Sequence, residues 1–207
     1  EINVQTGNTH SERLMPQIEK LFAFAGACAA QVDAVAVSIG PGSFTGLRIG
    51  LATAKMLAYI WQKPIIGVPT LEALAYGCPA CGGFVSPLLD AQKGRVYQSL
   101  YLWEDGKLDE VWPVRIASVV QAFQDLAGLD CAVLVVGEAA REHDGLAAGE
   151  VRLAPEQFIM PRAASIAFLG REKWRQGLAV PAAGLNPLYV RRAEAEELWE
   201  RRCGAGT

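Results

Sequence analysis

A strand that passes through a glycine-rich turn directly into a helix constrains the fold of this chain most. Asp33–Ile39 is apolar and β-branched almost throughout, which is typical of a buried strand in the middle of a parallel sheet. The turn Gly40-Pro41-Gly42 ends that strand, and Thr45–Trp61 is predicted as a helix patterned with small residues. A strand followed at once by a helix predicts the α/β class, because the next parallel strand needs such a crossover.

The segments around this unit repeat the alternation of helix and strand. Apolar residues at three- and four-residue spacing predict a helix over His10–Ala25. A short strand, Ile65–Val68, and a further helix, Thr70–Tyr76, follow the helix after the turn. The order helix, strand, helix, strand, helix predicts parallel strands joined by right-handed crossovers.

A composition break at residues 77–83 divides the chain. The segment is rich in glycine and cysteine, and beyond it the pattern changes to strands joined by tight turns, typical of an antiparallel meander. We therefore expect an N-terminal domain over residues 1–82 and a C-terminal domain over 83–207. In the second we expect strands at Phe84–Leu89, Arg95–Trp103, Val111–Val114 and Ala132–Val136, helices at Ser118–Ala127 and Ala163–Gln176, a loop at Pro181–Pro187 and a charged tail at Glu194–Arg202.

Composition and charge limit the classes of function. The net charge of -3 argues against a nucleic-acid surface that works alone, since phosphate binding needs clustered positive charge. No apolar run reaches the length of a membrane span, and 5 cysteines without regular spacing are typical of reduced thiols. We therefore expect a cytoplasmic protein that does not enter a membrane. Because residue 1 is a glutamate and a helix follows soon, we also expect that the chain starts inside the protein.

The glycine-rich turn allows two interpretations. The spacing of Gly40, Gly42 and Gly46 is not that of a dinucleotide-binding fingerprint, and no lysine stands where a phosphate-binding P-loop needs one. Ser43 or Thr45 can cap the following helix and leave backbone N–H groups free to meet a phosphate. The alternative is a tight turn that needs glycine for its dihedral angles, and the spacing alone favours this alternative.

The helix after the turn carries a stripe of small residues. Gly46, Gly50 and Ala54 fall at positions i, i+4 and i+8 on one face, although a glycine inside a helix costs up to roughly 1 kcal/mol relative to alanine. A bare face of this kind either packs against the chain's own sheet or first helix, or faces outward as an interface. Apolar area close to the stripe comes from Met56, Tyr59 and Ile60.

Side chains that could carry catalysis or hold a metal give weak patterns. A metal-binding pair at i, i+4 from His10 would need a histidine where Leu14 stands, and His143 lies in polar sequence typical of a solvated loop. Cys78 and Cys81 form a C-x-x-C pair that favours a plain loop, with zinc or redox chemistry as open alternatives. No serine, histidine and carboxylate set is recognisable, so we predict neither a catalytic residue nor a metal ligand.

Asp90 closes a predicted buried strand just before a turn. This is a place where α/β proteins often hold a functional carboxylate, but with Lys93 and Arg95 nearby it is equally consistent with stabilising the turn. Gly137 ends the buried strand of the second half, as Gly40 ends that of the first. These positions suggest a coarse similarity between the two halves.

Four segments together resemble the bacterial TsaB (YeaZ) family. The first of them is long and highly specific, and the matches run from about Thr9 to Arg192, nearly the whole chain. The matching segments are SIGPGSFTGLRIG at 38–50, GVPTLEALA at 67–75, DA and VY at 90–91 and 96–97, and NPLYVR at 186–191.

The resemblance implies an actin-like ATPase (ASKHA) fold of two related α/β domains, of which this chain lacks most of the N-terminal strand pair. It implies a non-catalytic scaffold or activator subunit in the threonylcarbamoylation of adenosine in tRNA. In that family TsaB is the partner of TsaD, a paralogue that carries the metal site and transfers the threonylcarbamoyl group, and the ATPase TsaE joins them. tRNA is then reached only through the complex, and we expect the chain alone to form a homodimer.

The resemblance also assigns residues. TsaD carries an H-x-x-x-H metal motif on its first helix, and His10 with Leu14 stands at that place, so no metal is expected here. Members of the family pair through their first two helices. The implied partner interface comprises Leu14, Ile18, Gly46, Arg48, Gly50 and Ala54.

The resemblance also bears on nucleotide binding. We expect no cofactor bound by this chain alone, while ATP or ADP at the interface of the complex is an open alternative. The residues that would lie near a nucleotide are Gly40, Gly42, Ser43, Asp90 and Gly137.

A second hypothesis treats the chain as an enzyme in its own right. It would be a nucleotide-dependent transferase or a glycoprotease-like peptidase of actin-like fold. The Gly40–Ser43 loop, Asp90 and Gly137 are the residues that motivate it.

Overall fold

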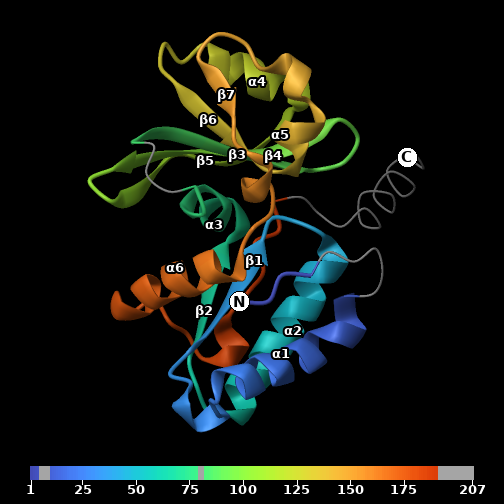
Figure 1. Ribbon diagram of the computed structural model, residues 1–207, viewed down its shortest axis with the longest axis vertical. Coiled ribbons are helices and arrows are strands. Elements are labelled where there is room, and N and C mark those ends of the chain that lie inside the picture. The colour runs from blue at the N-terminus through green and yellow to red at the C-terminus, as the bar shows by residue number, and fades with distance from the viewer. Residues whose placement is uncertain (5–9, 79–81, 191–207) are drawn as a thin grey trace, which may run out of the picture.

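The computed structural model describes residues 1–4, 10–78 and 82–190, which form two β-sheets with helices around and between them (Figure 1). The small sheet pairs β1 (Val35–Gly40) with β2 (Ile65–Pro69) in parallel, as the sequence predicted. The large sheet has the strand order β5-β4-β3-β6-β7. Among the described helices, none is long and apolar enough to cross a membrane.

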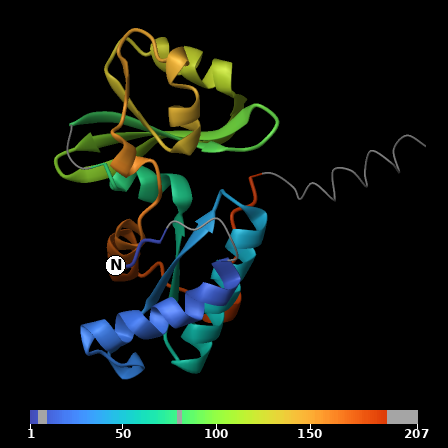
Figure 2. The same ribbon diagram turned by 45° about the vertical axis from the view of Figure 1, so that its right-hand side comes forward.

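Helices cover both faces of the small sheet (Figure 2). Successive strand residues point to opposite faces, so each strand contributes side chains to both helix layers. On one face, alternate residues of β1 pack against α2 (Phe44–Ile60). α1 (His10–Ala25) lies beside α2 and has the bounds that its periodicity predicted. The cluster beneath α2 joins the buried Leu51, Ala54, Ala58, Ile65 and Leu185 with Val35, Val37 and Ile39.

On the opposite face α6 (Ala163–Arg175) approaches the small sheet closely. A Cβ added at Gly170 would lie 2.5 Å from the Cβ of Ala36 in β1. Carbon atoms that are not bonded do not come this close, so the helix could not hold its position with a side chain at residue 170. Glycine at this point therefore sets the distance between α6 and β1.

Gly170→Ala is expected to lower the free energy of unfolding by about 1–3 kcal/mol, because the added methyl group overpacks the contact with Ala36. The loss should occur although alanine is the better helix former. Ala36→Gly in the same chain restores the space, so the double variant should be more stable than the sum of the single effects predicts. Urea unfolding of all four proteins measures this coupling, and strictly additive effects would contradict the close contact.

The large sheet is an antiparallel meander extended by two parallel strands. β3 (Gly83–Asp90), β4 (Arg95–Glu104) and β5 (Lys107–Ser118) pair antiparallel, as predicted. β6 (Val133–Val136) pairs in parallel with β3, and β7 (Val151–Leu153) pairs in parallel with β6. β3 therefore has an antiparallel neighbour on one side and a parallel neighbour on the other.

Two helices cover the two faces of the large sheet. α4 (Val119–Ala127) packs on the face that holds Leu88, and α3 (Thr70–Tyr76) packs on the face that holds Val85. α5 (Glu138–Glu142) follows β6 directly. Short 3-10 turns lie at Ala29–Gln31, Asp144–Leu146, Glu156–Phe158 and Ala182–Gly184.

α3 joins the two sheets. On one side Ala73 packs with Val68 of the small sheet, and the hydroxyl oxygens of Ser38 and Thr70 lie 2.7 Å apart in a hydrogen bond. On the other side the indole N–H of Trp103, in the large sheet, donates to a backbone carbonyl of α3 at 3.3 Å. The helix is thus fixed to both sheets by packing and by hydrogen bonds.

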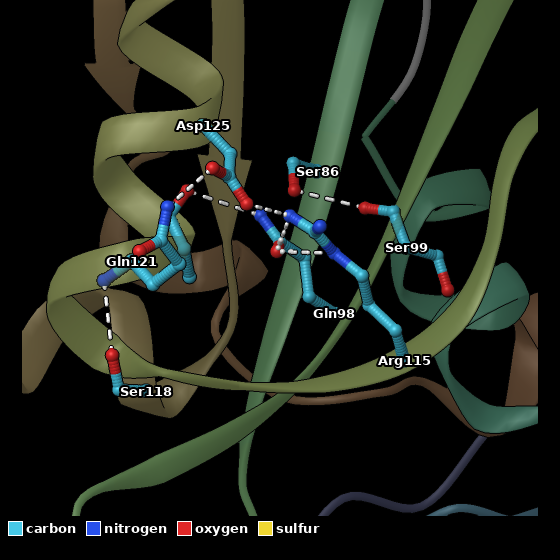
Figure 3. A network of polar contacts seen from close by, with 8 residues as sticks. Ser86, Gln98, Ser99, Arg115, Ser118, Gln121 and Asp125 are labelled. Carbon is cyan, nitrogen blue, oxygen red and sulfur yellow. Dashed lines mark hydrogen bonds and ion pairs between the residues drawn. The ribbon is translucent and has the colours of Figure 1, made fainter.

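A polar network fixes α4 to the large sheet (Figure 3). Gln98 of β4 is fully buried, and its amide nitrogen donates to the carbonyl of Ala122 at 3.3 Å. Arg115 of β5 donates from Nε and Nη2 to the Gln98 oxygen at 3.1 and 2.8 Å and forms an ion pair with Asp125. The carboxylate of Asp125 accepts hydrogen bonds from the side chains of Gln121 and Arg115. These bonds stabilise its charged form and hold the pKa of Asp125 below its usual value.

Several elements differ from the sequence-based expectations. β1 was predicted to be buried, yet Val35–Ile39 is only partly buried, because β2 is its one sheet partner within the described part of the chain. β5 extends well beyond the predicted Val111–Val114. α5 and β7 were not predicted at all.

The division of the chain after residue 82 stays a prediction. β3 begins at Gly83, where the large sheet starts. However, α6 comes from the second half of the sequence and packs against the small sheet of the first half. Segments from both predicted domains therefore build the unit around the small sheet.

Candidate functional site

The loop after β1 is held by a segment near the end of the described chain. The backbone N–H of Leu188 donates to the carbonyl of Ile39 at 2.7 Å. Gly40 has a φ of 107°, and a Cβ added there would lie 3.0 Å from the carbonyl oxygen of Leu188. The bond between Gly40 and Pro41 is cis. Glycine is therefore required at residue 40 by its dihedral angle and by a close neighbour.

Ser43 is the N-terminal cap of α2. Its hydroxyl oxygen accepts a hydrogen bond from the backbone N–H of Gly46 at 3.3 Å. Gly42 and Ser43 are both exposed. The capping role that the sequence predicted for Ser43 is confirmed, and it occupies the hydroxyl with the helix itself.

Asp90 and Gly137 lie at the same end of two neighbouring strands. Asp90 accepts a hydrogen bond from the backbone N–H of Gln92 at 2.7 Å, which is the turn-stabilising contact. Gly137 has a φ of 112°, and a Cβ added there would lie 2.2 Å from the carbonyl oxygen of Leu88. Glycine at residue 137 thus lets the end of β6 lie against β3.

The residues expected near a nucleotide make local contacts and lie in two different sheets. The hydroxyl of Ser43 is used as a helix cap, the carboxylate of Asp90 is used in a turn, and the space above Gly137 is filled by backbone. The loop at Gly40 and Gly42 follows the small sheet, whereas Asp90 and Gly137 lie in the large sheet. Their nucleotide role stays a prediction.

Glu138 is a titratable group that the sequence analysis missed. Partial desolvation raises the pKa of its carboxyl, and the nearby charges of Glu142 and Asp90 raise it further. The sequence signal for Glu138 was its place directly after Gly137, at the end of a predicted strand. In the structure, the carboxyl ends of the parallel strands β3 and β6 lie side by side, so Glu138 comes near Asp90. Proximity of Glu138 to Asp90 could be inferred only once that pairing was known.

Glu138→Gln is expected to stabilise the protein at neutral pH. Between the ordinary pKa of 4.5 and the raised folded value, the folded chain binds more protons than the unfolded chain, so the free energy of unfolding falls as pH rises. The glutamine removes this loss. Urea unfolding between pH 4 and 8 should show a gain at pH 7 that disappears near about pH 4. A gain that is equal at every pH would contradict the raised pKa.

α1 and α2 lie side by side with a groove between them. The rings of Phe22 and Trp61 meet edge to face, with centroids 5.6 Å apart. The groove has a volume of about 400 Å³ and is lined by α1 residues and by Leu57 and Trp61 of α2. No residue from 13 to 25 of α1 is buried. α1 is therefore attached to the rest of the molecule by a narrow contact.

The residues predicted for the partner interface differ in how far they are buried. Leu14, Ile18 and Gly50 are partly buried, but a Cβ added at Gly50 would meet nothing within 4 Å. Arg48 is exposed, with its guanidinium carbon 4.1 Å from the ring centroid of Phe44. Gly46 is partly buried and would contact only its own cap residue.

Ala54 corrects the predicted outward stripe. It is 7% exposed and packs beneath α2 with Leu51 and Ile65. Four residues of an α-helix advance about 40° beyond one full turn. Ala54 is therefore rotated by about 80° from Gly46, which brings it to the side of α2 that packs on the small sheet. The stripe is therefore open at Gly50 and buried at Ala54.

α1 and α2 expose large apolar side chains. Phe24 is 82% exposed and Tyr59 is 68% exposed. Met56, Tyr59 and Ile60 are thus exposed, as their apolar area near the stripe suggested. The set, called the α1–α2 apolar surface below, comprises Met15, Leu21 and Phe24 of α1 and Met56, Tyr59 and Ile60 of α2.

Within the described ranges, no group of three or more histidine, cysteine, aspartate or glutamate side chains lies close enough to hold a metal ion. His143 is exposed, as expected, and Cys78 is buried. Cys81 lies outside the described residues, as do the side-chain surroundings of His10. The predictions for the C-x-x-C pair and for His10 are therefore not decided here.

Comparison with known proteins gives consistent matches over nearly the whole chain. The sequence profile of the family described as TsaD: tRNA N6-adenosine threonylcarbamoyltransferase matches residues 4–199. The tRNA threonylcarbamoyladenosine biosynthesis protein TsaB of Bacillus subtilis is 36% identical, over 92% of this chain and 83% of that protein. The protein of the same name from Escherichia coli is 29% identical, over 94% and 85% of the two chains.

A solved structure has the same arrangement of sheets and helices. It comes from Pseudomonas aeruginosa and is described as an uncharacterized protein with similarity to peptidase YEAZ. The TM-score is 0.79 at 25% identity, with 89% of this chain and 85% of that chain covered.

Proposed function

This chain belongs to the TsaB (YeaZ) family and takes part in tRNA threonylcarbamoyladenosine biosynthesis, and we propose that it does so as a non-catalytic subunit that binds a TsaD-like partner. The mixed α/β structure and the YeaZ likeness agree with the actin-like fold class that the sequence predicted. Because the substrate class is tRNA, we also propose a cytoplasmic location.

The α1–α2 apolar surface carries the proposal. Large apolar side chains that gather on two adjacent helices mark an interaction surface in a soluble protein. Gly50 lies open on the same helix pair, so a partner helix can approach α2 closely there. In the isolated chain the same surface would pair with a second copy, which supports a homodimer in the absence of the partner.

The site residues support a scaffold rather than a catalyst. Ser43 and Asp90 are both engaged in local hydrogen bonds that stabilise a helix start and a turn. We propose that a TsaE-like ATPase joins the assembly, that tRNA is engaged through the complex, and that ATP or ADP, where it takes part, lies against the partner. No chemical step is assigned to a residue of this chain.

Gly50→Arg is expected to abolish pairing with the TsaD-like partner and thereby tRNA modification. The fold should survive, because the position is open and arginine is a better helix former than glycine by about 1 kcal/mol. Size-exclusion chromatography with light scattering measures pairing, and circular dichroism checks the fold.

Gly50→Ala is the matched control, since a single methyl group meets nothing within 4 Å. It should pair and support modification as the parent does. Normal pairing by a folded Gly50→Arg chain would show that the interface lies elsewhere.

The second candidate is an enzyme that acts alone, as a nucleotide-dependent transferase or a peptidase. The observation in its favour is that Asp90, Gly137 and Glu138 gather at one edge of the large sheet. ATP or peptide hydrolysis by the purified chain, lost in Asp90→Ala, would support it. A chain that is inert alone, yet restores modification when TsaD, TsaE, tRNA and threonylcarbamoyl-adenylate are supplied, would exclude it.

A further inference from the structure

The outer face of α6 presents an aromatic ring followed by two arginines. Ser165, Leu169 and Gly170 of α6 are buried, whereas Phe168 and Arg171 are exposed. Phe168 is 48% exposed, and the guanidinium carbon of Arg171 lies 5.2 Å from its ring centroid. Arg175 follows one helical turn after Arg171 and is exposed too, so all three groups share a face.

These arginines form no ion pair with a carboxylate within the described part of the chain. The neighbouring cations are paired: Arg162 binds Glu1 at 2.6 Å, and Lys173 binds Glu72 at 3.0 Å. Arg171 and Arg175 have no such partner among the described residues. The acidic residue of α6, Glu172, is exposed beside them and offsets one of the two positive charges. The face is therefore locally positive in a chain whose net charge is -3.

α6 lies on the side of the small sheet that is opposite α2. Ala36 of β1 contacts α6, whereas its strand neighbours Val35 and Val37 pack toward α2. Figure 1 shows α6 on one side of the small sheet and α1 with α2 on the other. A partner seated on the α1–α2 apolar surface would thus leave the outer face of α6 accessible.

We propose that this face binds RNA, with Arg171 and Arg175 contacting phosphates and Phe168 stacking on an unpaired base. Exposed aromatic rings next to unpaired arginines are the combination by which proteins hold single-stranded nucleic acid. The positive charge complements a phosphate backbone. The choice of RNA over an acidic protein rests on the proposed function, because the substrate class of this pathway is tRNA.

The experiment measures tRNA binding by the complex of this chain with its TsaD-like partner. An unmodified tRNA transcript is titrated at several salt concentrations. Arg171→Gln with Arg175→Gln should weaken binding about tenfold and reduce the slope of log affinity against log salt by about 1.4, since each single-strand phosphate contact contributes about 0.7. Glutamine keeps the helix propensity, so α6 itself should remain intact.

Two further variants separate the contributions. Phe168→Leu keeps apolar area but removes the aromatic face, so it should weaken binding while the salt slope stays unchanged. Arg141→Gln with Arg152→Gln is the control for lost positive charge, because it removes two exposed arginines outside α6, which pair with Glu156 and Glu150. It should leave both affinity and slope as in the parent complex.

Every outcome is decisive. If the Arg171 and Arg175 variant binds tRNA like the control, or the parent complex does not bind tRNA, the proposal is wrong. If that variant fails to assemble with the partner, α6 is a protein contact and the proposal is also wrong. Assembly of the Gly50→Arg chain with the partner would instead overturn the α1–α2 interface and leave the α6 measurement valid.

Discussion

The position of one short, almost wholly buried helix determines how the two sheets are arranged. α3 has seven residues, and Leu71, Leu74 and Ala75 pack against the large sheet. Ala73, on its other side, packs against the small sheet and α6. A helix buried on both sides needs small side chains where it approaches each neighbour most closely, and two alanines in seven residues meet that need. Apolar packing alone is non-directional. The hydrogen bond between the hydroxyls of Thr70 and Ser38 fixes the position of α3 along β1.

The small sheet, once oriented by α3, separates two outer surfaces of different chemistry. The surface over α1 and α2 is apolar, which suits a protein partner. The surface over α6 is aromatic and basic, which suits a polyanion. β1 is the element that both helix layers share, because its odd and even residues face α2 and α6 in turn. A subunit built this way can engage a protein on one side without covering the other.

Sequence patterns predicted the helices and strands better than they predicted the burial of these elements and their contacts with one another. The periodicity of α1 is a local signal, and α1 and α3 both have the predicted bounds. The partial exposure of β1 and the burial of Ala54 depend on which neighbours are present, and no local pattern encodes this. The parallel pairing of β6 with β3 joins strands that are distant in sequence, so the meeting of Asp90 with Glu138 could not be foreseen. Gly137 was recognised as a strand end, but the carbonyl of Leu88 that makes glycine necessary belongs to another strand.

The attachment of α1 has a consequence for the strength of pairing. Because none of its residues from 13 to 25 is buried, this helix gains little free energy from the rest of the chain, and segments of that kind open locally more readily than the core does. In the proposed pairing, binding has to order α1 as well as bring two surfaces together, and part of the contact energy is consumed in that ordering. The dissociation constant of the complex would therefore depend on the helix content of α1 in the free subunit, through residues that touch no partner atom. Affinity could be tuned by stabilising α1 in the free state while the interface stays chemically the same.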